Sequence, residues 1–162
     1  MGFTIASARD LHPRLLKEAS VAPLDAVVGG RIKEVNRRGK FLWFTLDRDV
    51  ALVAHLGMTG QFLFPRHDRP APGHVRAHFE LKKGVKRRDL VFNDQRTFGW
   101  LSVEELQDGV PTSAQHIALD PFDPAFDRDA VIAKIRSRKA AIKSVILNQE
   151  IMSGVGNIYA DE

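Results

Sequence analysis

The sequence predicts an α+β protein in which an antiparallel β-sandwich or barrel-like lobe precedes a helical segment. Six short runs rich in β-branched and aromatic residues lie between positions 41 and 101, at the spacing of a sandwich or barrel. After Pro111 the apolar residues recur at helical spacing instead. Hydrophobic residues make up 44% and charged residues 27% of the 162 positions, an ordinary globular balance that excludes a disordered or purely coiled-coil chain.

The first part of the chain predicts one helix and then strands. Residues Ala6 to Ala19 predict a short helix that contains Pro13. Phe41–Leu46 and Val50–Leu56 flank a polar turn and predict a hairpin. The other expected elements are strands at Gln61–Phe64, Val75–Leu81, Asp89–Phe92 and Phe98–Leu101, with a basic hairpin loop at Lys82–Arg88.

The last 50 residues predict helices. Asp127 is expected to cap a helix that runs to about Arg138, and Ala140 to about Gln149 predicts a second helix. Two glycines then form a tight turn, after which Asn157 is expected to cap a further helix. We therefore expect a β-sandwich domain over residues 1–110 and a helical domain over residues 111–162.

The charge pattern permits a nucleic-acid partner. The net charge is +4, and basic clusters lie at residues 31–48, 82–88 and 134–143, around an acidic stretch at residues 104–129. This pattern favours an oriented face for a polyanion, although each cluster could also be a solvated surface. The absence of cysteine excludes disulfides, cysteine-ligated zinc and iron–sulfur clusters, and favours a reducing cytoplasm. No 18-residue apolar run or signal peptide is present, so we expect no membrane partner.

Two motifs offer reactive or inserting side chains. Arg37–Lys40 leads into a strand and presents Lys40, whose amine can act as a nucleophile or proton carrier when neutral. The simpler alternative is a basic edge-strand entry that resists aggregation. His55–Gly60 sets Met58 between two glycines, on a turn from which it could wedge between bases. The simpler alternative is a methionine packed in the core.

Two further motifs offer contacts to bases and phosphates. In Asn93–Gly99, Arg96 and Phe98 project to the same side of an extended segment and form a stacking and hydrogen-bonding pair. The alternative is a turn with a partly buried phenylalanine. The segment from Lys139 to Glu162 reads as helix, glycine turn and helix start, an arrangement suited to a phosphate. The alternative is a plain helical hairpin.

Taken in order, four segments closely resemble formamidopyrimidine-DNA glycosylase, the bacterial repair enzyme family for oxidised purines. The segments are RRGKFLWF from Arg37, HLGMTGQ from His55, NDQRTFG from Asn93, and AIKSVILNQ…GVGNIYADE from Ala141. The resemblance covers roughly residues 30–162. It implies a helix–two-turn–helix at the end of the chain. It also implies excision of 8-oxoguanine and formamidopyrimidines from double-stranded DNA, followed by strand cleavage at the abasic site through β,δ-elimination. It further implies a monomer that works at the bacterial nucleoid.

The resemblance also implies roles for individual residues. Met58, Arg96 and Phe98 match the residues that fill the space left by the extruded nucleotide. Lys40 matches the lysine credited with proton donation during elimination. The residues that match DNA contacts, mostly to phosphates, are His55, His74, Arg96, Arg138, Lys143 and Asn157.

The sequence departs from the family pattern in two places. The family begins with a nucleophilic proline and a catalytic glutamate, whereas this chain begins Met1-Gly2-Phe3. The family also carries a C-terminal zinc finger with four cysteines, and this chain has none. We therefore expect the middle of the family's protein, cut at both ends, with no cofactor. If Met1 is removed, the Gly2 amine could substitute only poorly for the missing proline, and Lys40 or Lys143 could form a weak imine with a site that is already abasic. The alternatives are a non-catalytic remnant that binds damaged DNA and a basic protein associated with RNA or the ribosome.

Overall fold

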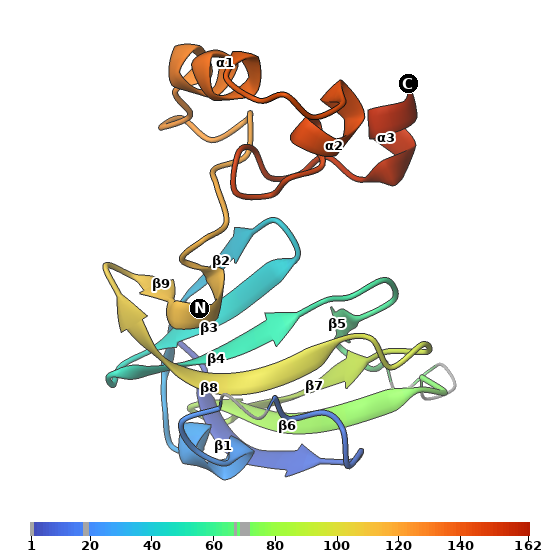
Figure 1. Ribbon diagram of the computed structural model, residues 1–162. Coiled ribbons are helices and arrows are strands. Elements are labelled where there is room, and N and C mark those ends of the chain that lie inside the picture. The colour runs from blue at the N-terminus through green and yellow to red at the C-terminus, as the bar shows by residue number, and fades with distance from the viewer. Residues whose placement is uncertain (1, 18–19, 67, 69–71) are drawn as a thin grey trace. The chain divides into compact units, whose positions relative to one another are not determined.

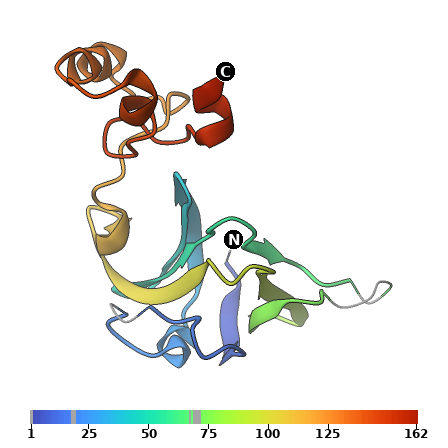
Figure 2. The same cartoon turned by 45° about the vertical axis from the view of Figure 1, so that its right-hand side comes forward.

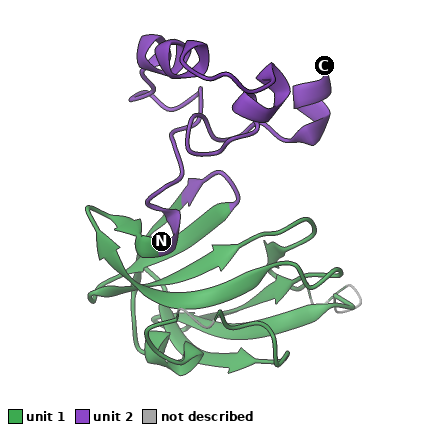
Figure 3. Cartoon of the chain, viewed as in Figure 1, with its two compact units in different colours: residues 1–36, 41–112 green, residues 37–40, 113–162 purple. Residues whose placement is uncertain are grey.

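The chain forms two compact units in the computed structural model, which describes residues 2–17, 20–66, 68 and 72–162 (Figure 3). Unit 1 comprises residues 1–36 and 41–112, and unit 2 comprises residues 37–40 and 113–162. The short turn at Arg37–Lys40 therefore belongs to unit 2, although the strands on either side of it lie largely in unit 1.

Unit 1 is a sandwich of two β-sheets (Figures 1 and 2). One sheet has the strand order β1-β6-β7-β5 and the other the order β2-β3-β4-β8-β9. The strands are β1 (Thr4–Asp10), β2 (Ile32–Arg38), β3 (Phe41–Leu46), β4 (Val50–His55), β5 (Gln61–Leu63), β6 (Val75–Lys83), β7 (Lys86–Asn93), β8 (Trp100–Gln107) and β9 (Val110–Pro111). Two 3₁₀ turns, η1 (Leu24–Val27) and η2 (Thr112–Ala114), complete the regular elements before the helices. The α+β class with antiparallel pairing is confirmed.

The core of unit 1 lies between the two sheets. Phe79 and Phe92 enter it from one sheet, and Leu52 and Leu101 enter it from the other, each with at most 1% of its surface exposed. The predicted hairpin at residues 41–56 is confirmed, because β3 and β4 pair antiparallel from Phe41–His55 onward. Every second residue of these strands faces this core, such as Phe44 and Leu46 on β3 and Leu52 and Ala54 on β4.

The predicted helix from Ala6 to Ala19 is wrong over the described residues. The segment Thr4–Asp10 is strand β1, which pairs antiparallel with β6 and places Asp10 opposite Ala77. Ile5 is buried in the sandwich core at 1% exposure. The alanines favour a helix locally, but long-range pairing and burial outweigh that small preference. Residues 18–19 of the predicted helix lie outside the described part of the chain.

The predicted loop at Lys82–Arg88 is mostly strand. β6 continues to Lys83 and β7 begins at Lys86, so the turn itself is only Gly84 and Val85. Gly84 has a φ of +58°, a conformation that glycine adopts without steric cost. The basic residues therefore stand on a regular two-stranded ribbon, which fixes the direction in which each one points.

Unit 2 contains three helices, α1 (Arg128–Arg136), α2 (Ile142–Ile146) and α3 (Asn157–Asp161). The predicted cap is confirmed, because the Asp127 carboxylate accepts a hydrogen bond from the Ala130 N–H at 2.9 Å. Helix α2 is shorter than expected and ends before Gln149. Asn157 is the first residue of α3 rather than its cap, and Gly156 occupies the cap position. In the described part of the chain, no helix combines the length and the apolar character needed to cross a bilayer.

Candidate nucleic-acid interface

A buried carboxylate joins two exposed loops of unit 1. Asp94 has 0% of its surface exposed and lies in the loop between β7 and β8. The hydroxyl of Thr59, in the loop between β4 and β5, donates a hydrogen bond to Asp94 Oδ1, and the Gly99 N–H donates to Oδ2 at 2.7 Å. The Arg96 N–H donates in turn to Thr59 Oγ1 at 3.1 Å. We call this set, Thr59, Asp94, Arg96 and Gly99, the Asp94 clasp.

The clasp keeps the carboxyl ionised. Burial by itself would raise the pKa of Asp94, because a charged group loses its hydration there. The hydrogen bond from the Thr59 hydroxyl lowers that pKa, and bonds from the backbone N–H groups of the same loop lower it further. The net effect holds the pKa of Asp94 below its ordinary value of 3.8. A charged acceptor strengthens each of the hydrogen bonds that it receives.

Gly57 brings the two loops into backbone contact. A Cβ atom at this position would lie 2.7 Å from the Phe98 carbonyl carbon and 2.8 Å from the Gly99 nitrogen, and φ is +56°. Glycine is therefore required here both by the close approach and by the backbone conformation. Thr97, on the facing loop, also has a positive φ of 56°, which is strained for a β-branched residue.

The clasped loops present three side chains to solvent. Met58 is 64% exposed, so it is not packed in the core. Phe98 is 55% exposed and follows a bend at residues 95–97, so this segment is a turn with a half-buried phenylalanine and not the extended segment predicted. The Arg96 guanidinium lies 5.3 Å from the centre of the Phe98 ring, within range of a cation–π contact. These three residues come from two adjoining loops, so the sequence-derived grouping of Met58 with Arg96 and Phe98 corresponds to one region of unit 1.

Two histidines lie beside these loops. The His55 ring stacks on Trp100 at 5.5 Å, and its Nδ1 accepts a hydrogen bond from the Gly57 N–H at 3.3 Å. His74 is exposed, and its carbonyl accepts a hydrogen bond from the Asp94 N–H at 2.9 Å. His74 and Met58 both line a cavity of about 380 Å³. Unit 1 thus surrounds its exposed Met58 with polar and aromatic side chains suited to a base or a phosphate.

The turn at Arg37–Lys40 packs within unit 2. Arg37 Nε donates to the Gly39 carbonyl at 2.9 Å, and Arg38 Nη1 donates to the Ile117 carbonyl at 3.3 Å. Gly39 has a φ of +55°. The two arginines are therefore partly used to shape the turn, while Lys40 is exposed at its end.

Gln149 organises the glycine turn of unit 2. Its Nε2 donates to the carbonyls of Leu147 at 3.2 Å and Val155 at 3.0 Å, and its Oε1 accepts from the Gly154 N–H at 3.3 Å. These bonds replace helical bonds that the chain gives up after Leu147, which explains why α2 ends before Gln149. Gln149 is therefore a turn residue, not the last residue of the helix predicted from Ala140 to about Gln149.

The expected phosphate contacts of unit 2 are all on its surface. Arg138, Lys143 and Asn157 are exposed. Lys143 Nζ forms an ion pair with Asp161 Oδ1, which links α2 to α3. A phosphate would have to compete with Asp161 for this lysine.

Sequence reasoning missed the residues that hold these surfaces in shape. Asp94, Thr59 and Gln149 were not singled out, because nothing in a single sequence distinguishes a buried carboxylate or amide from an exposed one. Within the described ranges, no group of three or more histidine and acidic side chains could hold a metal ion. The chain also has no cysteine, so the residues present do not fit a four-cysteine zinc site.

Comparison with protein families finds two adjoining matches. Residues 1–101 match the formamidopyrimidine-DNA glycosylase N-terminal domain, and residues 117–162 match the formamidopyrimidine-DNA glycosylase H2TH domain. Among curated proteins, the chain is 46% identical to the formamidopyrimidine-DNA glycosylase of Acidothermus cellulolyticus, over 100% of this chain and 57% of that protein. It is 44% identical to the enzyme of the same name from a Nocardioides species, over 100% of this chain and 56% of that protein.

Solved structures give the same match. The MutM (Fpg) protein from Thermus thermophilus aligns with a TM-score of 0.77 and 33% identity, over 100% of this chain and 56% of its own. The Lactococcus lactis formamidopyrimidine-DNA glycosylase bound non-covalently to DNA containing an abasic site aligns with a TM-score of 0.78 and 27% identity, over 100% of this chain and 60% of its own. The chain spans a little more than half the length of the relatives that it matches.

Proposed function

This chain belongs to the formamidopyrimidine-DNA glycosylase family, and from that premise we propose that it acts in base-excision repair of oxidised purines. The substrate is double-stranded DNA that contains 8-oxoguanine, a formamidopyrimidine or an abasic site. The reaction is removal of the damaged base followed by strand cleavage through β,δ-elimination. The same proposal places the protein, as a monomer, at the nucleoid in the bacterial cytoplasm, where that DNA lies.

The exposed Met58 next to the Asp94 clasp is the observation that carries the proposal. An enzyme that acts on a base must first extrude the nucleotide from the stack, at a cost of about a few kcal/mol. Apolar side chains inserted between base steps offset that cost. Met58 and Phe98 are large, exposed and apolar, and Arg96 adds hydrogen-bond donors for an orphaned base.

The basic residues would hold the DNA backbone. We assign phosphate contacts to His55 and His74 in unit 1, and to Arg138, Lys143 and Asn157 in unit 2. Such contacts set position rather than sequence preference, and they make affinity fall as salt rises. This assignment is supported by the exposure of His74 and of the three residues in unit 2.

We assign proton transfer during elimination to Lys40. Its side chain is exposed at the end of the Arg37–Lys40 turn, where it could reach a bound sugar or phosphate. A Schiff base between an amine and the sugar C1′ would precede elimination. Gly2 offers no free amine while Met1 is attached, because its nitrogen is then a peptide amide, and that N–H donates a hydrogen bond to the Ile32 carbonyl at 2.9 Å.

Borohydride trapping tests the catalytic proposal. The protein is incubated with a duplex that carries one 8-oxoguanine or one abasic site, and borohydride reduces any imine to a stable covalent adduct. We expect an adduct on the abasic duplex that depends on the protein. The proposal of catalysis by this chain is abandoned if neither duplex gives an adduct or a cut strand.

A second candidate function is recognition of damaged DNA without excision. The ion pair between Lys143 and Asp161 favours it, because a carboxylate engages this amine, and the peptide bond between Met1 and Gly2 favours it too, because it leaves Gly2 without an amine. This function predicts tight binding to abasic duplex, a steep salt dependence and no trapped adduct. Equal affinity for damaged and undamaged duplex would exclude the proposed wedge role of Met58, Arg96 and Phe98. Tighter binding to structured RNA than to abasic DNA would instead support an RNA-associated protein.

A further inference from the structure

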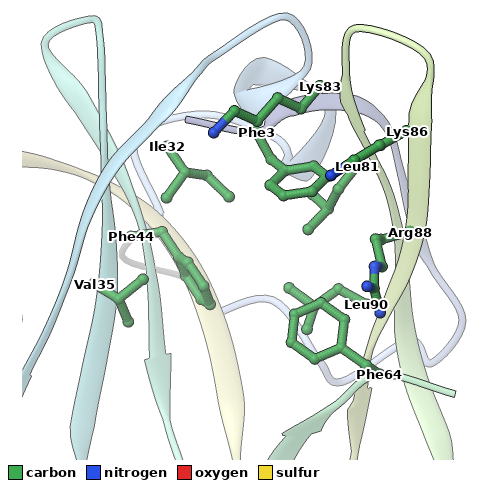
Figure 4. Close-up of a pocket in the computed structure, with 10 residues that line it drawn as sticks. All are labelled: Phe3, Ile32, Val35, Phe44, Phe64, Leu81, Lys83, Lys86, Arg88 and Leu90. Atoms are coloured by element: carbon green, nitrogen blue, oxygen red, sulfur yellow. The ribbon is translucent and has the colours of Figure 1, made fainter. Parts of the chain in front are cut away.

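A polar cavity lies beside Met58 in unit 1, where β5 begins and β7 ends. It has a volume of about 380 Å³, and its described lining is Met58, Thr59, Gly60, Gln61, His74, Asn93 and Gln95. We call it the amide cavity, after its three amide side chains. This lining contains no acidic side chain, lysine or arginine. It also differs from the lining of the larger cleft of about 590 Å³ shown in Figure 4, in which apolar side chains predominate. The amide cavity is therefore suited to a polar group without charge.

The strand register brings the amides together. Gln61 and Asn93 are directly opposite each other in the ladder between β5 and β7. Phe92, which precedes Asn93, is buried in the sandwich core, so alternation turns Asn93 and the opposite Gln61 to the other face of the sheet. Gln95 follows in the loop that contains the Asp94 clasp. The sheet and the clasp thus hold the three amides around one space.

The three amides differ in the hydrogen bonds that they can still make. Asn93 Oδ1 accepts from the His74 N–H at 3.1 Å, so its NH₂ group is the part that remains for a ligand. In the part of the chain that the structure describes, the side chains of Gln61 and Gln95 form no hydrogen bond, and both residues are exposed. Each glutamine therefore offers a ligand both a donor and an acceptor.

The two sides of the cavity carry different proposed roles. Met58 is the proposed wedge between bases, and His74 is a proposed phosphate contact. In a duplex, the groove edge of the neighbouring base pair lies between the base stack and the backbone. Proteins that insert apolar side chains between base steps commonly enter by the minor groove, which they read with residues that include asparagine and glutamine. The amide cavity thus faces the minor-groove edge of the pair beside the extruded nucleotide.

We propose that the amide cavity reads this neighbouring base pair, with Gln61 and Gln95 as specificity-determining residues that favour G·C over A·T. The guanine N2 amino group is the donor that distinguishes G·C from A·T in the minor groove, so a G·C pair satisfies the glutamine acceptor and an A·T pair leaves it unpaired. The Asn93 NH₂ group can donate to N3 or O2, which every pair offers, so it adds affinity without preference. The inference rests on the proposed function, because it needs a nucleotide extruded beside Met58.

Replacing single atoms of the neighbouring pair tests the proposal. The probes are duplexes with one abasic site whose neighbouring pair, on either side, is G·C, I·C, A·T or 2-aminoadenine·T. Inosine lacks only the N2 amino group of guanine, and 2-aminoadenine adds that group to adenine. Fluorescence anisotropy with the full chain should show about fivefold tighter binding to G·C than to I·C, on one side of the site only. The added amino group of 2-aminoadenine should restore the tighter binding. The ratio should stay constant as salt rises, because a hydrogen bond between neutral groups releases no counterions.

Matched variants locate the reading residues. In the double variant Gln61→Met and Gln95→Met, the ratio of affinities for G·C and I·C should fall from about five to about one, while the preference for abasic over undamaged duplex remains. The control is Gln107→Met, an exposed glutamine opposite Val110 at the other end of β8, which should keep the ratio of the wild type. A thermal melt of each variant checks that it is folded, and the comparison of G·C with I·C in the wild type needs no variant.

The outcomes separate this inference from the function on which it rests. Equal affinity of the wild type for abasic and undamaged duplex overturns both, because no extruded nucleotide would then lie beside the cavity. A clear abasic preference with equal affinity for G·C and I·C on both sides of the site overturns this inference alone. A G·C preference that survives in the double variant, or that Gln107→Met abolishes as well, also overturns it, because other residues would then read the pair.

Discussion

Replacing the carboxylate of the Asp94 clasp should loosen both loops that carry the proposed wedge. In Asp94→Asn, one of the two carboxylate oxygens becomes an amide NH₂ group. Oδ1 accepts from the Thr59 hydroxyl and Oδ2 accepts from the Gly99 N–H at 2.7 Å. An NH₂ group toward Gly99 places a donor against a donor, whereas an NH₂ group toward Thr59 forces the hydroxyl to become the acceptor, and both orientations lose the charged acceptor. The substitution keeps the size of the side chain and changes its charge and its hydrogen bonds.

The expected loss in the free energy of unfolding follows from these hydrogen bonds. A hydrogen bond to a charged acceptor is worth about 1.5–3 kcal/mol, and the side chain is fully buried, so water cannot replace the lost bond. We therefore expect Asp94→Asn to lower the free energy of unfolding by about 2 kcal/mol, which is a fall of about 5 to 10 °C in Tm. The Gly99 amide should also exchange its hydrogen faster, because Asp94 is its acceptor.

The functional assay is the ratio of affinities for abasic and undamaged duplex. The phosphate contacts are common to both duplexes and cancel in this ratio, so it isolates the wedge. We expect the abasic preference to fall by about tenfold in Asp94→Asn, equivalent to about 1.4 kcal/mol. Thr59→Ser keeps the hydroxyl and should retain the preference, whereas Thr59→Val removes it and should resemble Asp94→Asn.

Asp89→Asn is the matched control. Asp89 is a partly exposed residue of β7, the strand that leads into the Asp94 loop, and forms an ion pair with His78 at 3.0 Å. Its loss should change stability by less than about 1 kcal/mol. The reasoning is refuted if Asp94→Asn keeps the wild-type preference for abasic duplex while its Gly99 amide exchanges faster. It is also refuted if Asp89→Asn reduces the preference equally, since the effect would then be one of net charge.

Three further predictions concern the same surfaces. Gly57→Ala should lower the free energy of unfolding by about 2–4 kcal/mol in a denaturant titration, because the added Cβ would lie 2.7 Å from the backbone of Phe98 and φ is +56°. The control Gly73→Ala should have little effect on this free energy, because no atom lies within 4 Å of the added Cβ. The stabilisation by ionised Asp94 should be complete above its ordinary pKa of 3.8 and lost as pH falls through its lower folded-state pKa. The difference in Tm between wild type and Asp94→Asn should therefore shrink below about pH 4. A difference that stays constant with pH would contradict the view that the charge of Asp94 provides the stabilisation. Asp161→Asn should release Lys143 from its ion pair. Fluorescence anisotropy should then show about twofold higher affinity for DNA at low salt and no gain at high salt. A lower affinity would instead mean that the ion pair positions α2 for DNA binding.

The strands of the sandwich and the turn that carries Met58 could be predicted because both depend on local pattern, whereas the grouping of Met58 with Arg96 and Phe98 came from the family resemblance. The run Phe41–Leu46 is rich in aromatic residues, which favours a strand, and Met58 between two glycines indicates a turn. Strand β1 was missed because its alanines carry no strand preference of their own, and its pairing with β6 lies about 70 positions away in the chain. Asp94 was missed for the same reason, since its partner Thr59 is 35 positions away.

The length of α2 shows a different limit. Ile142, Val145, Ile146 and Gln149 keep helical spacing, yet the helix ends at Ile146. The side chain of Gln149 supplies hydrogen bonds to the glycine turn, and those bonds compete successfully with continuation of the helix. The spacing of apolar residues predicts which face of a helix would be apolar. It does not predict which side chain will form hydrogen bonds with the backbone groups and so end the helix.

The span of the Thr59–Asp94 bond has a consequence for the order of folding. Its two ends are separated by strands β5, β6 and β7, so the bond closes only after those strands have found their register. Closing such a loop costs entropy that only a nearly complete sheet can offset. A partly folded chain would therefore lack an assembled Met58–Phe98 surface, and only the complete sandwich would present the proposed wedge.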